Sequence, residues 1–265
     1  MSKIQKAITE IDNIESLADR DEWVCKLHPL VKLAITIYYI VLVVSFSIYD
    51  LVGLMAMVVY PIALFTIADL SITDAIKRLR VVLPVICLVG LFNPFLDKNV
   101  ITIGDTVILA GIISMFTLIL KGIFAVLASY ILIATTTIEK ICYALRLLHV
   151  PRIIVTEIML IYRYVTLLLE EVNRITTAYS LRAPGQKGVH YKVWGSLTGQ
   201  LLLRSMDRAQ NVYDSMTLRG YNGDFDYLAD SVTCKCGDVM YLLFWVILLA
   251  IFRWIPIIAL VGSLF

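Results

Sequence analysis

Residues 152–182 read RIIVTEIMLIYRYVTLLLEEVNRITTAYSLR, and this stretch decides the fold of the polar part of the chain. Its apolar residues recur at alternating intervals of four and three, at Ile154, Ile158, Ile161, Val165, Leu168, Val172, Ile175 and Tyr179. That spacing is typical of a long helix with a coiled-coil seam. A helix over this stretch would be about 46 Å long.

A second stretch, 192–219, repeats the pattern with Leu202, Met206, Ala209, Tyr213 and Met216 at the same intervals. The sequence therefore predicts two long amphipathic helices that cross. Eight apolar positions are the candidate seam residues: Ile158, Ile161, Val165, Leu168, Val172, Met206, Tyr213 and Met216.

Each stretch ends on leucine, arginine and a small residue. The first ends at Leu181-Arg182-Ala183, before Pro184-Gly185, and the second ends at Leu218-Arg219-Gly220. For one helix, the helix dipole explains such a cation, with a gain of about 0.3–1 kcal/mol, and glycine is a common terminator. Two long helices in tandem that end alike favour a paired docking device.

The composition places the rest of the chain in a membrane. Of the 265 residues, 60% are hydrophobic and only 17% are charged, which is outside the range of ordinary soluble domains. Five apolar runs can supply spans: 33–48, 51–68, 81–96, 107–135 and 239–265. The third run contains Pro84 and Asn93-Pro94, and its residues would cover only about 24 Å, which is less than the thickness of a hydrocarbon core. We therefore expect a kinked or incomplete span there.

Lys121 interrupts the fourth apolar run, and two arrangements are open. One is a tilted span with a buried cation, and the other is a surface helix followed by a span from about Gly122. An ionisable residue in a span is a functional candidate, but a lysine near a boundary whose ammonium group reaches the membrane surface is the favoured interpretation.

The distribution of basic residues predicts the topology. Segments 1–32, 68–80 and 136–237 hold 20 of the 23 Lys and Arg residues, so we expect them in the cytosol. Five crossings follow, with the N-terminus inside. The predicted fold is an all-α polytopic membrane protein with about five spanning helices, divided into 1–135, a cytoplasmic helical region at 136–237, and a last span at 238–265. Segment 1–32 is amphipathic enough to lie on the membrane surface.

Several function classes lack support in the sequence. There is no phosphate-binding Gly-x4-Gly-Lys-Ser/Thr loop, and His28, His149 and His190 are far apart. Cys234-Lys-Cys236 offers too few ligands for a zinc site. The net charge of +2 does not suggest nucleic acid as a partner. We expect a non-catalytic protein with no catalytic residue, cofactor or metal site.

Further motifs complete the pattern. Residues 144–152 read ALRLLHVPR, 207–221 read DRAQNVYDSMTLRGY, and 27–33 read LHPLVKL; the shorter motifs are Tyr162-Arg163-Tyr164, Glu170-Glu171, Ile11-Asp12 and Thr135-Thr136-Thr137. With these, nearly the full chain resembles the transmembrane (T) components of energy-coupling factor (ECF) transporters. Within that family it is most similar to the cobalt branch, the CbiQ-like proteins.

The resemblance implies a coupling subunit for ATP-driven uptake. In that family two ABC-type ATPase subunits grip the coupling helices through Ala-Arg-Gly motifs. Closure of the ATPase pair then reorients a substrate-binding (S or CbiM-like) membrane subunit, sometimes accompanied by a small accessory membrane subunit. By position the docking residues would be Leu181, Arg182, Ala183, Leu218, Arg219 and Gly220. Ala183 replaces the usual glycine, so Arg219 matches the motif more closely.

The substrate is left open among cobalt, nickel and vitamins, since the family places recognition in the partner subunit. Cobalt is favoured by the N-terminal motif and by Arg219-Gly220-Tyr221. Outside the family, a membrane scaffold or channel is the alternative. A channel should carry polar residues along several spans, and these runs offer little beyond Asn93 and Lys121.

Overall fold

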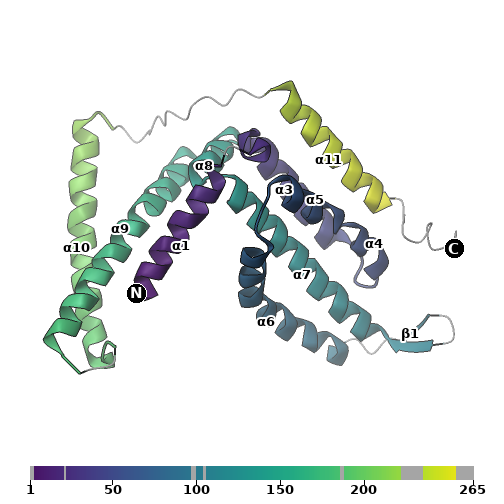
Figure 1. The fold of residues 1–265 in the computed structure, drawn as a ribbon, viewed down its shortest axis with the longest axis horizontal. Helices are drawn as coiled ribbons and strands as arrows, with labels where there is room; N and C mark the ends of the chain where they lie inside the picture. Colours follow the sequence, from purple (N-terminus) through teal and green to yellow (C-terminus); the bar gives the residue numbers. More distant parts are fainter. Residues whose placement is uncertain are drawn as a thin grey trace. The chain divides into compact units, whose positions relative to one another are not determined.

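The computed structural model describes residues 3–20, 22–96, 100–103, 106–185, 188–221 and 235–254. Within these ranges the chain is helical apart from turns and one short β-hairpin, which confirms the expected all-α membrane class (Figure 1). The chain folds as two compact units. The polar unit comprises Met1–Ser16 and Ile138–Ser231, and the apolar unit comprises Leu17–Thr137 and Val232–Phe265. The expected division at 135 and 237 stays a prediction.

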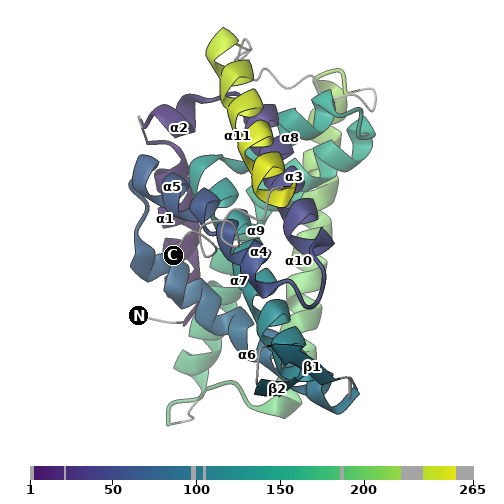
Figure 2. The same ribbon diagram turned by 90° about the vertical axis from the view of Figure 1, so that its right-hand side faces the viewer.

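The apolar unit holds most of the helices (Figure 2). In chain order its elements are α2 (Trp23–Lys26), α3 (Pro29–Ser45), α4 (Leu51–Ala56), α5 (Val59–Ile67), α6 (Ile72–Leu96), β1 (Val100–Ile103), β2 (Thr106–Leu109), α7 (Ala110–Thr135) and α11 (Cys236–Trp254). The strands β1 and β2 pair antiparallel, with Val100 opposite Leu109. Among the described helices, α7 and α11 are long and apolar enough to cross a membrane, and α3 and the α4–α5 stretch are shorter.

Helix α7 is the centre of this unit, because α3, α4, α5 and α6 all contact it. Its buried Phe124 and Ala128 lie in one apolar core with Tyr39 of α3 and Leu249 of α11. The Tyr39 and Tyr60 rings stack at 4.4 Å between centroids. Such continuous apolar packing explains why these segments form a bundle.

Helix α6 is longer than the apolar run that the sequence marks as the third span, and it is not among the described helices that are apolar enough to cross a membrane. It begins at Ile72, includes the polar residues before the apolar run, and is 25 residues long, or about 37 Å. It packs closely on α7, since a Cβ at Gly122 would lie 2.6 Å from Ile86 Cδ1. Asn93 Nδ2 donates to Ser114 Oγ at 2.9 Å. The part of α6 that contains Pro84 and Pro94 is therefore packed against α7, an environment in which membrane helices tolerate proline.

Lys121 lies within one continuous helix, which excludes the surface helix followed by a separate span. Its Nζ donates to the carbonyl oxygens of Val44 and Phe46, at 3.0 and 2.6 Å. Arg253 of α11 donates to the carbonyl of Ser45 at 3.0 Å, and its guanidinium lies over the Phe46 ring. Two cations therefore stabilise the carbonyl end of α3, where the helix dipole is negative.

A third cation, Lys32, holds together the opposite end of the bundle. Lys32 of α3 is buried, and its Nζ donates to the carbonyl oxygens of Thr135 at 2.7 Å and Cys25 at 3.3 Å. It thus joins the motif at 27–33 to the threonine motif at 135–137. The tie holds the last residue of α7, just before the chain enters the polar unit.

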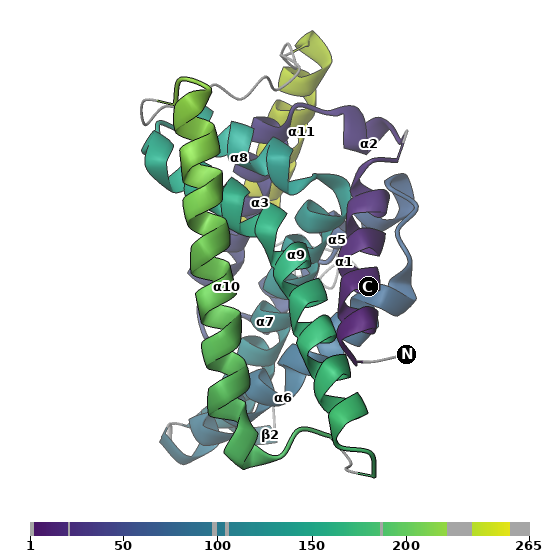
Figure 3. The ribbon, with the colours of Figure 1, turned by 90° about the vertical axis from the view of Figure 1, so that its left-hand side faces the viewer.

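The polar unit contains α1 (Lys3–Ala18), α8 (Ile138–Leu147), α9 (Arg152–Arg182) and α10 (Tyr191–Leu218). Helices α9 and α10 run in opposite directions and cross (Figure 3). At the end of α8, Val150 N donates to Leu145 O and His149 N to Arg146 O, with His149 at a positive φ of 62°. This is a Schellman termination. Pro151 then begins α9.

Candidate docking surface

The first helix end is exposed and apolar. Leu181 is 77% exposed, and the guanidinium of Arg182 also faces solvent. Helix α9 ends at Arg182 and is capped by Ala183, whose φ of −124° is allowed for any residue and whose N donates to Tyr179 O at 3.1 Å. The positive φ occurs later, at Gly185. The alanine in place of the usual glycine is therefore compatible with this backbone.

The second helix end has a different termination. Gly220 has a φ of +88°, Tyr221 N donates to Met216 O, and Gly220 N donates to Thr217 O, both at 3.0 Å. These are the two hydrogen bonds of a Schellman motif, so the helix termination predicted at Gly220 is confirmed. Leu218 is 89% exposed and Arg219 is exposed beside it.

The two ends share an arrangement that folding alone does not require. Each combines an exposed leucine with an exposed arginine, and within the described residues neither Arg182 nor Arg219 has a hydrogen bond or ion pair from its side chain. Arg182 is joined to the start of α10 by a short connector, whereas Arg219 caps its far end. With 28 residues, α10 is itself roughly 42 Å long, which is the distance from its first residue to the end that carries Arg219.

The seam residues are only partly covered. On α9, burial increases toward the C-terminal half: Ile158 and Ile161 are exposed, Val165, Leu168 and Val172 are partly exposed, and Ile175 is buried. On α10, Met206 and Tyr213 are 60% and 58% exposed, Met216 is partly exposed, and no residue is buried. The apolar stripe of α10 thus remains available to another surface.

Sequence reasoning missed the ion pair that joins the two long helices. Glu171 of α9 is 8% exposed, accepts a hydrogen bond from Arg204 Nη1 of α10, and has Arg174 Nη1 at 3.6 Å. A signal was present: Glu171 is three residues after Leu168 and four before Ile175, so it lies on the seam face. A buried carboxylate in this position requires a cation from the facing helix.

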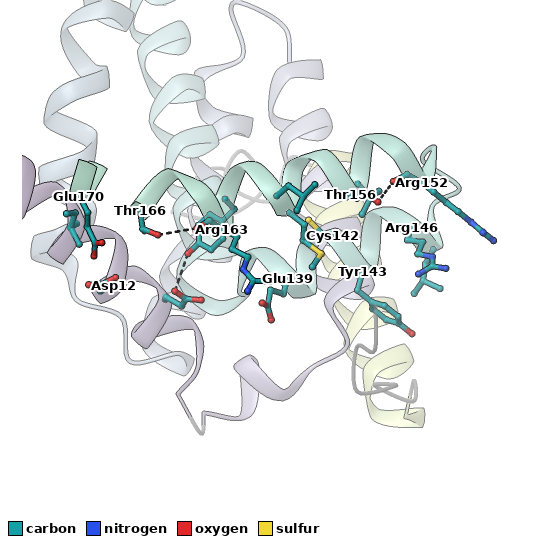
Figure 4. A pocket seen from close by; sticks show the side chains of 17 residues that line it. Asp12, Glu139, Cys142, Tyr143, Arg146, Arg152, Thr156, Arg163, Thr166 and Glu170 are labelled. Atoms are coloured by element: carbon teal, nitrogen blue, oxygen red, sulfur yellow. Dashed lines mark hydrogen bonds between the residues drawn. The ribbon is translucent and has the colours of Figure 1, made fainter. Parts of the chain in front are cut away.

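A cavity of about 820 Å³ lies inside the polar unit, between α1, α8 and α9 (Figure 4). Its lining is acidic toward α1, with Asp12, Glu15 and Glu170, and includes the half-exposed Tyr162, whose hydroxyl donates to Glu15 Oε2 at 3.4 Å. Burial, followed by the charge of Glu15, raises the pKa of the Tyr162 phenol. The cavity shows that α1 packs on the Tyr162 motif of α9.

The histidines act at helix ends. His28 Nδ1 accepts from Leu30 N at the start of α3, and His190 Nδ1 accepts from Lys192 N at the start of α10. In the described ranges, no three His, Cys, Asp or Glu side chains are grouped as a metal site would need. Cys236 is exposed, and Cys234 lies outside the described residues.

Comparison with known proteins gives a family and several relatives. A family model described as cobalt transport protein (CbiQ) matches residues 20–227. An uncharacterised protein of Methanocaldococcus jannaschii is 26% identical over 70% of this chain and 67% of its own length. The cobalt transport protein CbiQ of Salmonella typhimurium is 26% identical over 44% of this chain and 52% of its own length. The nickel permease LarQ of Lactiplantibacillus plantarum is 28% identical over 34% of this chain, a match that spans only a third of the permease.

Proposed function

Because the chain belongs to the cobalt transport protein (CbiQ) family, we propose that it is the transmembrane coupling subunit of an ATP-driven, ECF-type importer. Family membership supports a role as a membrane transport component. The observation that carries the finer proposal is the pair of exposed Leu-Arg helix ends at opposite ends of α10. The length of α10, roughly 42 Å, would let each end bind a separate ATPase subunit.

The two ends would act as docking points. A guanidinium with no internal partner can form a forked pair of hydrogen bonds with a carboxylate in an ATPase groove, while Leu181 or Leu218 fills an apolar pocket next to it. When ATP closes the ATPase pair, the two docked ends move relative to each other. The rigid helices α9 and α10 would carry that movement to the rest of the complex. In this scheme partner subunits hydrolyse ATP, and this chain is not catalytic.

The remaining partners are a substrate-binding membrane subunit of the CbiM kind, in some complexes a small accessory membrane subunit, and the lipid bilayer. The exposed stripe of α10, with Met206 and Tyr213, would contact the membrane subunit. Cobalt is the proposed cargo, on the basis of the family. Nickel is the second candidate, because a nickel permease is among the relatives. A vitamin stays the third.

The test is recovery of partners from native membranes with a tagged copy of the chain. Wild type should retain an ABC-type ATPase, and Arg182→Glu/Arg219→Glu should lose at least about 90% of it, because two docking charges are reversed. Lys192→Glu is the control, since this exposed cation lies in the first turn of α10 and outside both Leu-Arg motifs. Equal recovery with the double variant would reject the docking model. Absence of any ATPase with wild type would favour a membrane scaffold.

A further inference from the structure

The carboxylate of Glu171 has two cationic partners with different roles. Arg174 belongs to the same helix, so it accompanies Glu171 wherever α9 moves. Arg204 belongs to α10, so its hydrogen bond to Glu171 fixes where α10 lies along α9. Because Glu171 is almost fully buried, an arrangement that removes its α10 cation leaves only Arg174 to compensate the carboxylate and is disfavoured.

A second cation on α10 lies within the same hollow. Glu171, Arg204, Asp207, Arg208 and Asn211 together line a cavity of about 440 Å³. Arg208 follows Arg204 by one helical turn, so both lie on one face of α10, about 6 Å apart along its axis. Within the described residues, the Arg208 side chain has no hydrogen bond or ion pair, and it is exposed.

We propose that Glu171, Arg204 and Arg208 are positioning residues that set two registers of α10 on α9. In the first register Arg204 pairs with Glu171, as in this structure. In the second, α10 has moved by one turn and Arg208 takes the place of Arg204. One-turn shifts of one packed element past another are a known form of switching. The inference rests on the proposed function, because the shift would move Arg219 relative to Arg182.

The chain can accommodate such a movement. No residue of α10 is buried, so a shift along its axis disrupts no tightly packed core. One Glu–Arg pair is exchanged for another of the same kind, and Arg174 partly neutralises Glu171 throughout.

A double-mutant cycle in the full complex tests the second register. Arg204→Gln should lower the thermal unfolding midpoint of the nucleotide-free protein, because it removes the existing pair. Arg208→Gln should leave that midpoint and ATPase recovery unchanged and lower cobalt uptake by cells about fivefold or more. Arg208→Lys should restore part of the uptake. Lys192→Gln is the control and should change none of these quantities.

Glu171→Gln decides whether Arg208 acts through Glu171. If it does, Arg208→Gln should cause no further loss of uptake in a Glu171→Gln background. Wild-type uptake with Arg208→Gln, or an equal loss in both backgrounds, would overturn the two-register proposal.

Spin labels at positions 180 and 215, on α9 and α10, give a readout independent of uptake. In a complex whose other cysteines are replaced, a non-hydrolysable ATP analogue should shift the interlabel distance by about 6 Å, and Arg208→Gln should abolish the shift. An unchanged distance in the parent protein would reject the movement. These failures differ from failure of the proposed function, in which wild type recovers no ATPase.

Discussion

At the scale of single residues, the left-handed backbone at Gly220 makes the second proposed docking end depend on glycine. A side chain at φ +88° is strained by about 1–2 kcal/mol. Gly220→Ala should therefore destabilise the Schellman end and reduce ATPase recovery. Gly199→Ala, inside α10, is the control, because no atom beyond its own turn of helix lies within 4 Å of its Cβ position; it should stabilise the protein by about 0.5–1 kcal/mol. Chemical unfolding measures both, and equal effects would contradict the assignment.

Also at this scale, Cys142 should be an unreactive thiol. Burial, followed by the charge of Glu139, raises the pKa of Cys142, and its side chain is 2% exposed. Because the thiolate is the reactive species, alkylation at neutral pH should be at least about tenfold slower than at the exposed Cys236. Glu139→Gln removes one cause of the shift and should accelerate alkylation of Cys142. Mass spectrometry of the two peptides measures both rates, and similar rates in wild type would reject the prediction.

At the scale of elements, the sequence predicted the long helices well and the polar ties poorly. The four-three seam and the flanking Pro151 and Ala183-Pro184 predicted α9 as observed, because periodicity and proline act locally. The start of α6 was missed, since the polar residues after Ile72 lack an apolar pattern although they continue the helix. The contacts of Lys32, Lys121 and Glu171 join segments distant in the chain, which no local pattern encodes.

The end of α3 gives the prediction that belongs to this scale. Lys121→Met removes both hydrogen bonds to the carbonyls of Val44 and Phe46 and should destabilise the apolar unit by about 1–2 kcal/mol. Lys77→Met is the control, because the Lys77–Asp74 pair is on the surface, with Lys77 77% exposed, and such pairs contribute about 0–1 kcal/mol. Thermal unfolding in detergent compares the two. If Lys121→Met destabilised the protein no more than Lys77→Met does, the hydrogen bonds of Lys121 to the end of α3 would not be important for stability.

At the scale of the whole molecule, the distribution of charge predicts a topology, which can be tested at the turn after α3 and the turn before α6. Ser47 follows α3 and Ser71 precedes α6, and both are exposed. With the N-terminus in the cytosol, α3 crosses outward and the α4–α5 stretch returns, so position 47 should be outside and position 71 inside. Single cysteines at these positions, in a chain whose five native cysteines are replaced by alanine, report the side through a membrane-impermeant maleimide. Intact cells should label position 47 only, and permeabilised cells should label both. Labelling of position 71 in intact cells would contradict the predicted orientation. It would also place the proposed docking ends away from the cytosolic ATP that the proposed function requires.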